Sequence, residues 1–248
     1  MTIGIFGTGR FGSFWARTLC EHARVVTYSR SNRPAPEGCR AVSIEELGKA
    51  DCVMLCVAIH AVPDAVAQLV PHLGKKTVLM DTCSVKIYPV QMMLEGAAKE
   101  TEIIGTHPMF GPDSASAGVA GLPFVFSRVR CSDETADRYY GFFEAMGMRI
   151  VARTPEDHDR EAAMTQGVTH FIGRVLAELD LEPSHIATKG YQKLLEVMEQ
   201  TCNDPYDLFI DLQRLNPYTS LMRRRLRESI ARIAGALDGS LDTGSSPS

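Results

Sequence analysis

The sequence has no long apolar run, and no stretch of it approaches the ~20 residues that a helix needs to cross a membrane. It also has no excess of positive charge, because the net charge is -4 over 248 residues. A surface for nucleic acid or for an anionic membrane is therefore not expected. The first strand-like run begins at Ile3, which leaves no room for a signal or transit peptide before it. These absences favour a cytoplasmic protein whose partner is a small molecule.

Paired cysteines are absent too. The seven cysteines are an odd number, are scattered, and form no C-x-x-C motif. We expect reduced thiols of a cytoplasmic protein, most of them small buried side chains. No group of cysteines and histidines has the spacing of metal ligands, so we expect no metal site. The composition, 45% hydrophobic and 23% charged, is that of an ordinary globular protein.

The first part of the chain, residues 1–152, alternates short apolar runs with amphipathic stretches such as Val62–Leu73 and Pro89–Ala98. This alternation predicts an α/β fold, a Rossmann-type doubly wound parallel sheet with helices on both faces. The predicted strands are Ile3–Phe6, Val25–Tyr28, Cys52–Val57, Thr77–Met80, Ile103–Thr106, Pro123–Phe126 and Met148–Val151.

The second part, residues 153–238, has helical periodicity only. One predicted helix covers Asp157–Asp180, and two or three more follow the break at 181–184. We expect an all-helical domain that binds substrate and forms a homodimer, although these helices could instead pack only on their own sheet. The Gly/Ser-rich residues 239–248 are predicted to be a disordered tail.

A glycine-rich segment, Gly7-Thr8-Gly9-Arg10-Phe11-Gly12, directly follows the first strand and begins a helix. In this context the first glycine forms the turn, the second admits a pyrophosphate and the third lets helix and strand pack closely. The free N–H groups at the helix start would then bind the phosphates. The segment predicts a dinucleotide site, with Val57 at the end of a later strand also beside the cofactor.

An acidic residue that would bind a free ribose 2′-hydroxyl is missing. It should stand about twenty residues after the glycines. Instead the second strand ends in Tyr28-Ser29-Arg30-Ser31, and no carboxylate follows until Glu37. Two hydroxyls around a guanidinium can bind a 2′-phosphate, which favours NADP. The alternative is a solvated loop arginine.

Two polar segments follow predicted strands, where a doubly wound sheet binds its ligand. One begins at Asp81 and contains Ser84, and the other contains His107 followed by Pro108. A histidine at a strand end can serve as a general base near neutral pH, and Ser84 could hydrogen-bond it or a substrate hydroxyl. His107 could also be a structural loop residue.

The order of these motifs resembles one known family. After GTGRFG come SVK at 84–86, THPMFGP at 106–112 and EDHDR at 156–160. The series, from about residue 3 to 235, resembles the prephenate and arogenate dehydrogenases of tyrosine biosynthesis. TKGY at 188–191 and TCNDPYDLF at 201–209 are most similar to the branch with the plant arogenate dehydrogenases.

The resemblance implies an oxidative decarboxylation of a cyclohexadienol. Hydride passes from the hydroxyl-bearing carbon to the nicotinamide, a base takes the hydroxyl proton, and loss of carbon dioxide makes the ring aromatic. By the same resemblance His107 is the proton acceptor and Ser84 orients it or the hydroxyl. No catalytic role is assigned to His158, for which a helix-capping or interdomain role is expected.

The resemblance also implies substrate-binding residues in the helical part. Gln166 and His170 are i and i+4 on one helix, so they share a face and would close over the substrate. Thr188 would add a polar contact. Without the family pattern, a histidine satisfied at a helix interface would be the preferred interpretation of His170.

Asp204 bears on the choice between arogenate and prephenate. Within this branch an acidic residue at the matching position goes with arogenate, whose ammonium it would pair, and Asn goes with prephenate. A shift of one residue would put Asn203 there instead, and Asp204 could be only a helix N-cap. We predict NADP-dependent oxidation of arogenate, with prephenate as the alternative.

One position departs from the wider family pattern: Gln192 stands where many prephenate-type relatives carry a carboxylate-binding arginine. Lys189, Lys193 or a partner subunit could bind the carboxylate instead. Two other classes remain open. A β-hydroxyacid dehydrogenase or imine reductase would use a lysine on an interdomain helix, and a non-catalytic NADPH sensor would need neither Ser84 nor His107.

Overall fold

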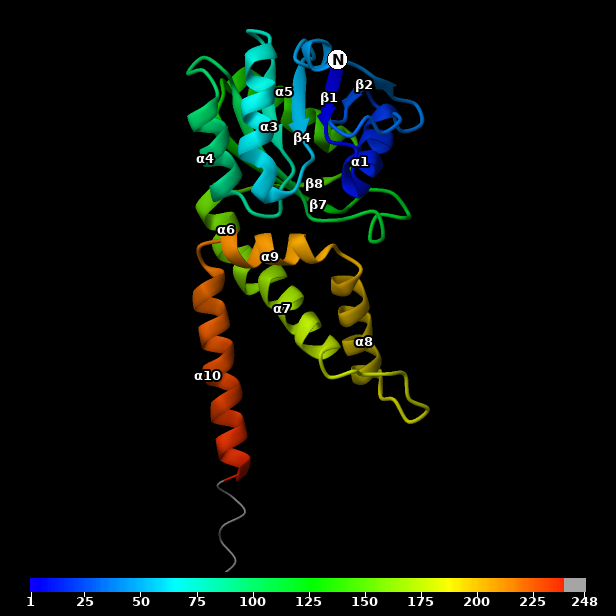
Figure 1. Cartoon of the computed structure of the whole chain (residues 1–248), viewed down its shortest axis with the longest axis vertical. Coiled ribbons are helices and arrows are strands. Elements are labelled where there is room, and N and C mark those ends of the chain that lie inside the picture. Colours follow the sequence, from blue (N-terminus) through cyan, green and yellow to red (C-terminus); the bar gives the residue numbers. More distant parts are fainter. Residues whose placement is uncertain (239–248) are drawn as a thin grey trace, which may run out of the picture. The chain divides into compact units, whose positions relative to one another are not determined.

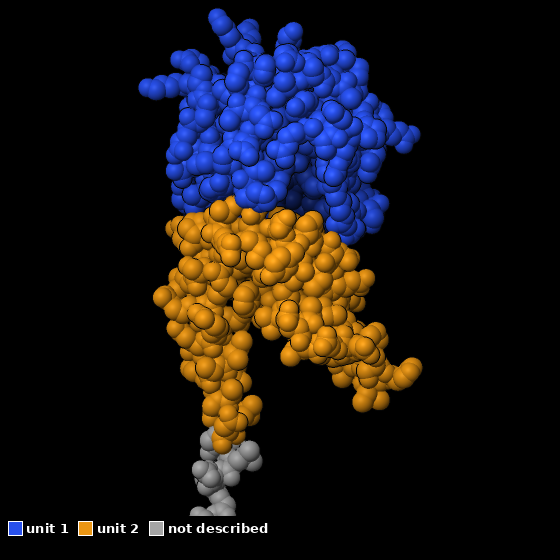
Figure 2. Space-filling model, in the orientation of Figure 1, with its two compact units in different colours: residues 1–159 blue, residues 160–248 orange. Residues whose placement is uncertain are grey.

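The computed structural model describes residues 1–238, and the predicted disordered tail, residues 239–248, lies outside them. The chain divides into two compact units, Met1–Asp159 and Arg160–Ser248, coloured separately in Figure 2. The functional boundary predicted after residue 152 stays a prediction.

Within residues 1–159 the first unit is built on an eight-stranded sheet in the order β3-β2-β1-β4-β5-β6-β7-β8. Figure 1 labels β1, β2, β4, β7 and β8 of this sheet. The strands are β1 Thr2–Phe6, β2 Arg24–Tyr28, β3 Arg40–Ala41, β4 Cys52–Leu55, β5 Val78–Asp81, β6 Ile103–Pro108, β7 Pro123–Arg130 and β8 Arg149–Ala152. The Rossmann-type α/β fold is confirmed. The short strand β3 was not predicted from the sequence, because a strand of two residues is too short to show a hydrophobic periodicity.

The last two strands correct the predicted direction. β7 pairs antiparallel with β6 and parallel with β8, so the sheet is mixed rather than wholly parallel. The physical reason is the connection between β6 and β7. The described segment 109–122 contains no helix, whereas a parallel pair is usually joined by a crossover helix.

Helices cover both faces of this sheet. On one face α1 (Arg10–Cys20) and α5 (Asp133–Ala145) share a core with the sheet around the fully buried Trp15, which is stacked on Phe124 and Phe143. The other face carries α2 (Ile44–Leu47), α3 (Val62–Leu69) and α4 (Ile87–Gly96). A side chain at Gly4 would meet Leu47, and one at Gly105 would meet Val90. Two 3-10 turns, Ile59–Ala61 and Val70–His72, flank α3, so the predicted helix Val62–Leu73 ends early, before Pro71.

The second unit, as far as residue 238, is all-helical as predicted. α6 (Pro155–Met164) runs across the boundary, and α7 (Gln166–Ala177), α8 (Lys189–Cys202), α9 (Tyr206–Leu215) and α10 (Thr219–Asp238) follow. The predicted helix Asp157–Asp180 is broken at Thr165, whose hydroxyl donates to the carbonyl of Glu161 at 2.9 Å. Such bonds compete with the helical ladder. None of the helices within residues 1–238 is long and apolar enough to cross a membrane.

Candidate functional site

The turn between β1 and α1 has the shape that a dinucleotide loop requires. Gly7 has φ +105, and a side chain there would lie 2.6 Å from the carbonyl oxygen of Cys56. A side chain at Gly12 would collide with the carbonyl oxygen of Gly7, whereas one at Gly9 would meet nothing within 4 Å. The first and third glycines therefore let strand and helix pack closely, and the second leaves open space over the turn.

The start of α1 is suited to an anion. Gly9 caps the helix without a side-chain hydrogen bond, and its first turn contains no acidic residue. Thr8 is buried, and within residues 1–238 its hydroxyl oxygen has no hydrogen-bond partner. A helix start without a side-chain cap, the positive end of the helix dipole and the unsatisfied hydroxyl of Thr8 fit the pyrophosphate of a dinucleotide.

A cavity of about 380 Å³ opens beside this turn, within the ~300–1,000 Å³ range of small-molecule pockets. Its lining takes in the predicted cofactor residues Gly7, Thr8, Gly9, Ser29, Arg30, Ser31 and Val57. The predicted residues Arg10, Phe11 and Gly12 lie outside the lining. Arg10 forms an ion pair with Asp113 at 2.5 Å, and Phe11 is stacked near Trp15.

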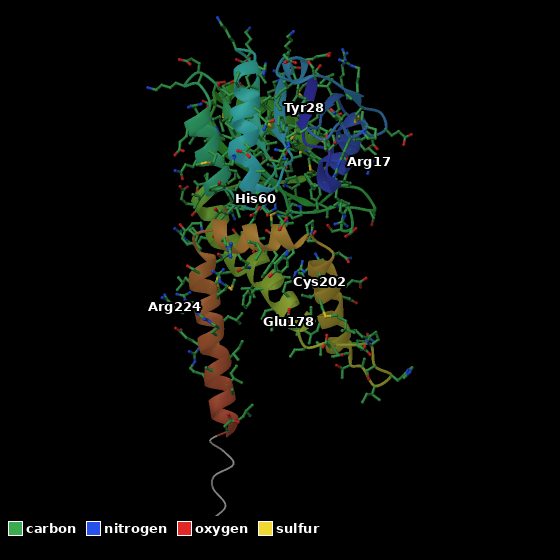
Figure 3. The ribbon with its side chains drawn as sticks, viewed as in Figure 1. Arg17, Tyr28, His60, Glu178, Cys202 and Arg224 are labelled. Atoms are coloured by element: carbon green, nitrogen blue, oxygen red, sulfur yellow. The ribbon has the colours of Figure 1, made fainter. Side chains whose placement is uncertain are left out.

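The β2–β3 loop supplies the cationic end of this cavity. The backbone N–H of Asn32 donates to the carbonyl of Ser29, and Asn32 has φ +50. This turn places the hydroxyls of Ser29 and Ser31 3.2 Å apart and brings Arg33 into the lining with Arg30. Sequence reasoning missed Arg33, for which the turn-forming Asn32 was the available signal. It also missed the contribution of the α3 side: His60 (labelled in Figure 3), Asp64 and Gln68.

His107 lies near the end of β6 and is 4% exposed. Its Nδ1 is 2.8 Å from Nε2 of His158, and Nδ1 of His158 is 2.8 Å from Oδ1 of Asp159. The three side chains form a chain of hydrogen bonds that sequence reasoning did not find. The adjacent residues His158-Asp159 were its only signal, and nothing in the sequence pairs them with a histidine on β6.

The direction of these hydrogen bonds assigns the tautomers of His107 and His158. A carboxylate only accepts, so Nδ1 of His158 donates to Asp159, and Nε2 of a neutral His158 then accepts. Nδ1 of His107 must then donate to His158, and the lone pair of His107 lies on Nε2. His107 is thereby set as a hydrogen-bond acceptor toward any substrate that reaches Nε2.

The surroundings of His107 keep it neutral. Burial lowers the pKa of its imidazole well below the ordinary 6.5, and the neighbouring His158 and Lys86 lower this pKa further. A histidine with a lowered pKa holds its lone pair free at neutral pH, as a general base must.

Lys86 is fully buried beneath this site. Its ammonium pairs with the fully buried carboxylate of Asp81 and donates to the carbonyl oxygen of Thr106 at 2.6 Å. Asp81 also accepts from the backbone N–H of Cys83 at 3.0 Å and of Thr106 at 3.2 Å. The pair ties the end of β5 to β6, one residue before His107.

Asp159 also accepts hydrogen bonds from the backbone at the start of α4. Its two carboxylate oxygens accept the backbone N–H groups of Lys86 at 2.7 Å and of Ile87 at 2.9 Å. These are the first groups of α4, whose own N-cap supplies no side-chain bond. One buried carboxylate therefore caps α4 and orients His158.

Ser84 lies between β5 and α4 and is 8% exposed. Within the described chain its hydroxyl oxygen has no hydrogen-bond partner, and no bond between Ser84 and His107 is formed there. An unsatisfied buried hydroxyl is costly unless a ligand completes it.

In the second unit, Gln166 and His170 lie one turn apart on α7. Oε1 of Gln166 and Nδ1 of His170 are buried, and within residues 1–238 neither has a hydrogen-bond partner. Nε2 of His170 is 3.9 Å from Oδ2 of Asp204. Burial lowers the pKa of His170, Asp204 raises it and Arg174 lowers it.

The turn that carries Asp204 is held in place by Arg174. Its guanidinium donates to the carbonyls of Thr201 at 3.1 Å and of Asp204 at 2.8 Å. The N-cap of α9 is Pro205 rather than Asp204, and Asn203 is an exposed residue at the C-cap of α8. The structure therefore brings Asp204 to His170, and the alternative that Asp204 is the N-cap of α9 is wrong.

Thr188 lies apart from that group. It is exposed, and it caps α8 by accepting from the backbone N–H of Tyr191 at 3.2 Å. α8 is 14 residues long, or about 21 Å, and Asp204 follows its other end. Lys189, Gln192 and Lys193 are exposed in its first turns. A substrate role for Thr188 stays a prediction, and so does the identity of the group that binds the substrate carboxylates.

Comparison with known proteins identifies the family. Residues 20–127 match the family model "Prephenate dehydrogenase, nucleotide-binding domain", and residues 175–246 match "TYRAAT1-like, C-terminal domain".

No group of three or more His, Cys, Asp or Glu side chains among the described residues could hold a metal ion.

The chain is 34% identical to arogenate dehydrogenase 2 of Arabidopsis thaliana over 97% of its own length and 71% of that protein. Two solved structures are similar in fold. The prephenate dehydrogenase of A. aeolicus, in complex with hydroxyphenyl propionate and NAD+, has a TM-score of 0.75 at 16% identity, covering 98% of this chain and 92% of that one. Synechocystis arogenate dehydrogenase has a TM-score of 0.65 at 19% identity, covering 98% and 99%. The chain belongs to the arogenate and prephenate dehydrogenase family.

Proposed function

We propose that this member of the arogenate and prephenate dehydrogenase family converts L-arogenate to L-tyrosine by NADP-dependent oxidative decarboxylation. The observation that carries the proposal is the hydrogen-bonded chain from Asp159 through His158 to His107. It presents a neutral imidazole, with its lone pair on Nε2, near the carboxyl end of β6, in the same sheet whose strand β1 leads into the dinucleotide turn.

In the proposed reaction Nε2 of His107 accepts the proton of the substrate's ring hydroxyl. A nicotinamide dinucleotide held at the Gly7–Gly12 turn would supply the hydride acceptor. The hydroxyl of Ser84, unsatisfied within the described chain, binds the same substrate oxygen and holds it for His107. Asp159 and His158 stabilise the imidazolium that forms. Loss of carbon dioxide then leaves an aromatic ring, and His107 returns its proton to solvent.

Asp204 supports arogenate as the substrate. An ammonium group near a half-buried carboxylate is stabilised, whereas the α-keto acid side chain of prephenate has no positive charge to offer it. Burial keeps His170 largely neutral, since it lowers the pKa below 6.5, so His170 does not cancel the charge of Asp204. Gln166 and His170 contribute two unsatisfied buried polar atoms for the remaining substrate groups. Prephenate is the second candidate.

Two arginines support NADP. Arg30 and Arg33 line the cavity together with the hydroxyls of Ser29 and Ser31, against a single carboxylate, Asp64. A 2′-phosphate can accept hydrogen bonds from both guanidinium groups and both hydroxyls. The free 2′-hydroxyl of NAD would leave that charge uncompensated.

Initial rates with arogenate and prephenate, each with NADP and with NAD, test the proposal directly. We expect efficient turnover only with arogenate and NADP. Asp204→Asn should raise the KM for arogenate and reduce the preference over prephenate about tenfold or more. Asp207→Asn, an exposed acid in the first turn of α9, is the matched control and should change neither value. Equal use of both substrates by the unchanged protein would contradict the role of Asp204.

The cofactor is tested by a separate variant. Arg30→Ser should raise the Kd of NADP about tenfold or more and leave that of NAD unchanged. Arg24→Ser, an exposed arginine at the start of β2 and outside the cavity lining, is the control. If the protein binds NADPH but turns over neither substrate, the sensor hypothesis replaces the proposed activity.

We also propose that the protein is a homodimer formed through α10. This helix exposes a row of apolar side chains: Ile230 is 54% exposed, Ile233 66% and Leu237 65%. Their spacing of three and four residues puts them on one side of the helix, as in a helix–helix interface. A second copy of the same helix could bury this row.

A further inference from the structure

Cys20 and Cys39 are neighbours in space although separated along the chain. Their sulfur atoms are 2.8 Å apart, closer than an ordinary non-bonded contact but longer than an S–S bond, which is about 2.05 Å. Cys20 is the last residue of α1, and Cys39 directly precedes β3. Both are thiols, and both are partly exposed. Arg17, labelled in Figure 3, marks the last turn of α1 on this side of the first unit.

The position of Cys39 links the pair to the cofactor cavity. The β2–β3 loop runs from Ser29 to Cys39, and its first part carries the cavity-lining Arg30 and Arg33. β2 fixes the beginning of this loop. At its other end a turn, with the N–H of Cys39 donating to the carbonyl of Pro36 and Gly38 at φ +77, brings Cys39 to α1.

We propose that Cys20 and Cys39 are an oxidisable dithiol, which a hydroperoxide converts to an intramolecular disulfide that fixes the cofactor loop to α1. In the first step the Cys20 thiol and the hydroperoxide ROOH give the sulfenic acid of Cys20 and ROH. The Cys39 thiol then attacks that sulfur, releasing water and forming the S–S bond. Two thiols are oxidised, and one peroxide bond is reduced.

The two sulfurs form a hydrogen bond in which either thiol can be the donor. Burial raises the pKa of the Cys39 thiol to about 12, and its hydrogen bond with Cys20 contributes to this rise. The hydrogen-bonded contact puts the Cys39 sulfur within reach of a sulfenic acid formed on Cys20, so the second step needs little movement of either side chain. Cys131 and Cys202, which are also partly exposed, have no cysteine within hydrogen-bonding distance among the described residues.

The disulfide should stabilise the chain and, if the proposed NADP site is correct, tighten cofactor binding. Closing a loop of about 20 residues restricts the unfolded chain and should raise Tm by about 5 to 10 °C. A loop fixed at both ends also loses less freedom when Arg30 and Arg33 bind a 2′-phosphate, so the Kd of NADP should fall about threefold.

Peptide mapping after treatment with hydrogen peroxide tests the disulfide. The oxidised full-length protein, digested with trypsin without reductant, should yield peptide 18–24 linked to peptide 31–40, because cleavage before Pro34 is disfavoured. Dithiothreitol should separate the two peptides. Cys39→Ser should abolish the linked product and the Tm shift, and Cys131→Ser is the matched control that should retain both.

Other outcomes contradict the proposal in distinguishable ways. Sulfinic or sulfonic acid at Cys20 without a linked peptide would show that Cys39 cannot complete the bond. A linked peptide with an unchanged or lower Tm would show that the bond distorts the fold. An unchanged Kd for NADP would refute the link to the loop, whereas failure of both redox forms to bind NADP would count against the proposed function and leave the dithiol result standing.

Discussion

The two ring nitrogens of His107 have different tasks, and this division gives the first prediction at the residue scale. Nδ1 is held by His158, so Nε2 is left for the substrate. His107→Gln should reduce kcat by a factor of about 10² to 10⁴, because general-base catalysis is lost. The Kd of NADP should stay within twofold, since the cavity lining does not include this residue. A kcat within tenfold of the unchanged enzyme, measured under saturating substrate, would exclude His107 as the base.

His158 provides a prediction that separates positioning from packing. In His158→Gln the side-chain oxygen can still accept from Nδ1 of His107 and preserve its tautomer, whereas His158→Leu offers no acceptor. We expect kcat to fall about tenfold with Gln and about 100-fold or more with Leu, with little change in KM. Equal losses in the two variants would indicate that His158 acts through packing alone.

The lowered pKa of His107 predicts how stability and activity respond to acid. The unfolded chain binds this proton near pH 6.5, and the folded protein binds it only at lower pH. The unfolded state therefore holds more protons in that interval, and stability falls as the pH decreases below 6.5. Above pH 6.5 the imidazole is neutral in both states and contributes nothing. The acid limb of kcat/KM should also lie below pH 6.5, and His107→Gln should reduce the acid loss of Tm.

Single residues also show what the sequence could and could not reveal. The positions of Ser84, after β5, and of His107, near the end of β6, were predictable because apolar runs mark both strands, and ligands of a doubly wound sheet bind at strand ends. Their catalytic roles stay predictions. His158 was not, since its bond to His107 joins residues 51 positions apart. Thr188 followed the family pattern, but the length of α8 separates it from Asp204. Such distances depend on tertiary packing, which local periodicity does not encode.

At the scale of elements, α4 depends on a carboxylate from another helix. Asp159→Ala would leave three donors without their acceptor: the N–H groups of Lys86 and Ile87 and Nδ1 of His158, the first and last of them buried and that of Ile87 partly buried. We expect a loss of about 3 kcal/mol in the free energy of unfolding, together with a lower kcat. Urea denaturation measures the first effect. Asp133→Ala, in the exposed first turn of α5, is the control and should cost much less. A comparable loss in both variants would refute the special role of Asp159.

Elements were predictable where their pattern was local. The buried strands β1, β2, β4, β5 and β6 and the turn at Gly7 follow from short apolar runs and from glycine geometry. The reversed direction of β7 and β8 follows from a helix-free connection of 14 residues, 109–122, which alternation alone does not distinguish from a crossover. The break at Thr165 depends on side-chain bonds to the backbone, and a periodic pattern passes through it unnoticed.

At the scale of the whole molecule, the proposed dimer rests on α10. Ile233→Glu would place a charge in the middle of the exposed apolar row, where a dimer interface would have to bury it at high cost. We expect the variant to sediment as a monomer at micromolar concentration, while the unchanged protein sediments as a dimer. Glu228→Lys, exposed on the opposite side of α10, is the matched control and should remain dimeric.

This variant also tests whether assembly matters for activity. The first unit by itself contains the cofactor cavity and the hydrogen-bonded side chains of His107, His158 and Asp159. NADP binding should therefore survive dissociation of the dimer. If a partner subunit supplies the group that binds the substrate carboxylates, the monomer should show a KM for arogenate raised about tenfold or more, with an unchanged Kd for NADP. Full activity in a confirmed monomer would place that group within one chain, and an unchanged protein that is itself monomeric would refute the dimer. Exposed apolar side chains on a helix are tolerated singly but rarely in rows. We therefore expect the unchanged protein to be a dimer and the monomeric variant to show the raised KM for arogenate.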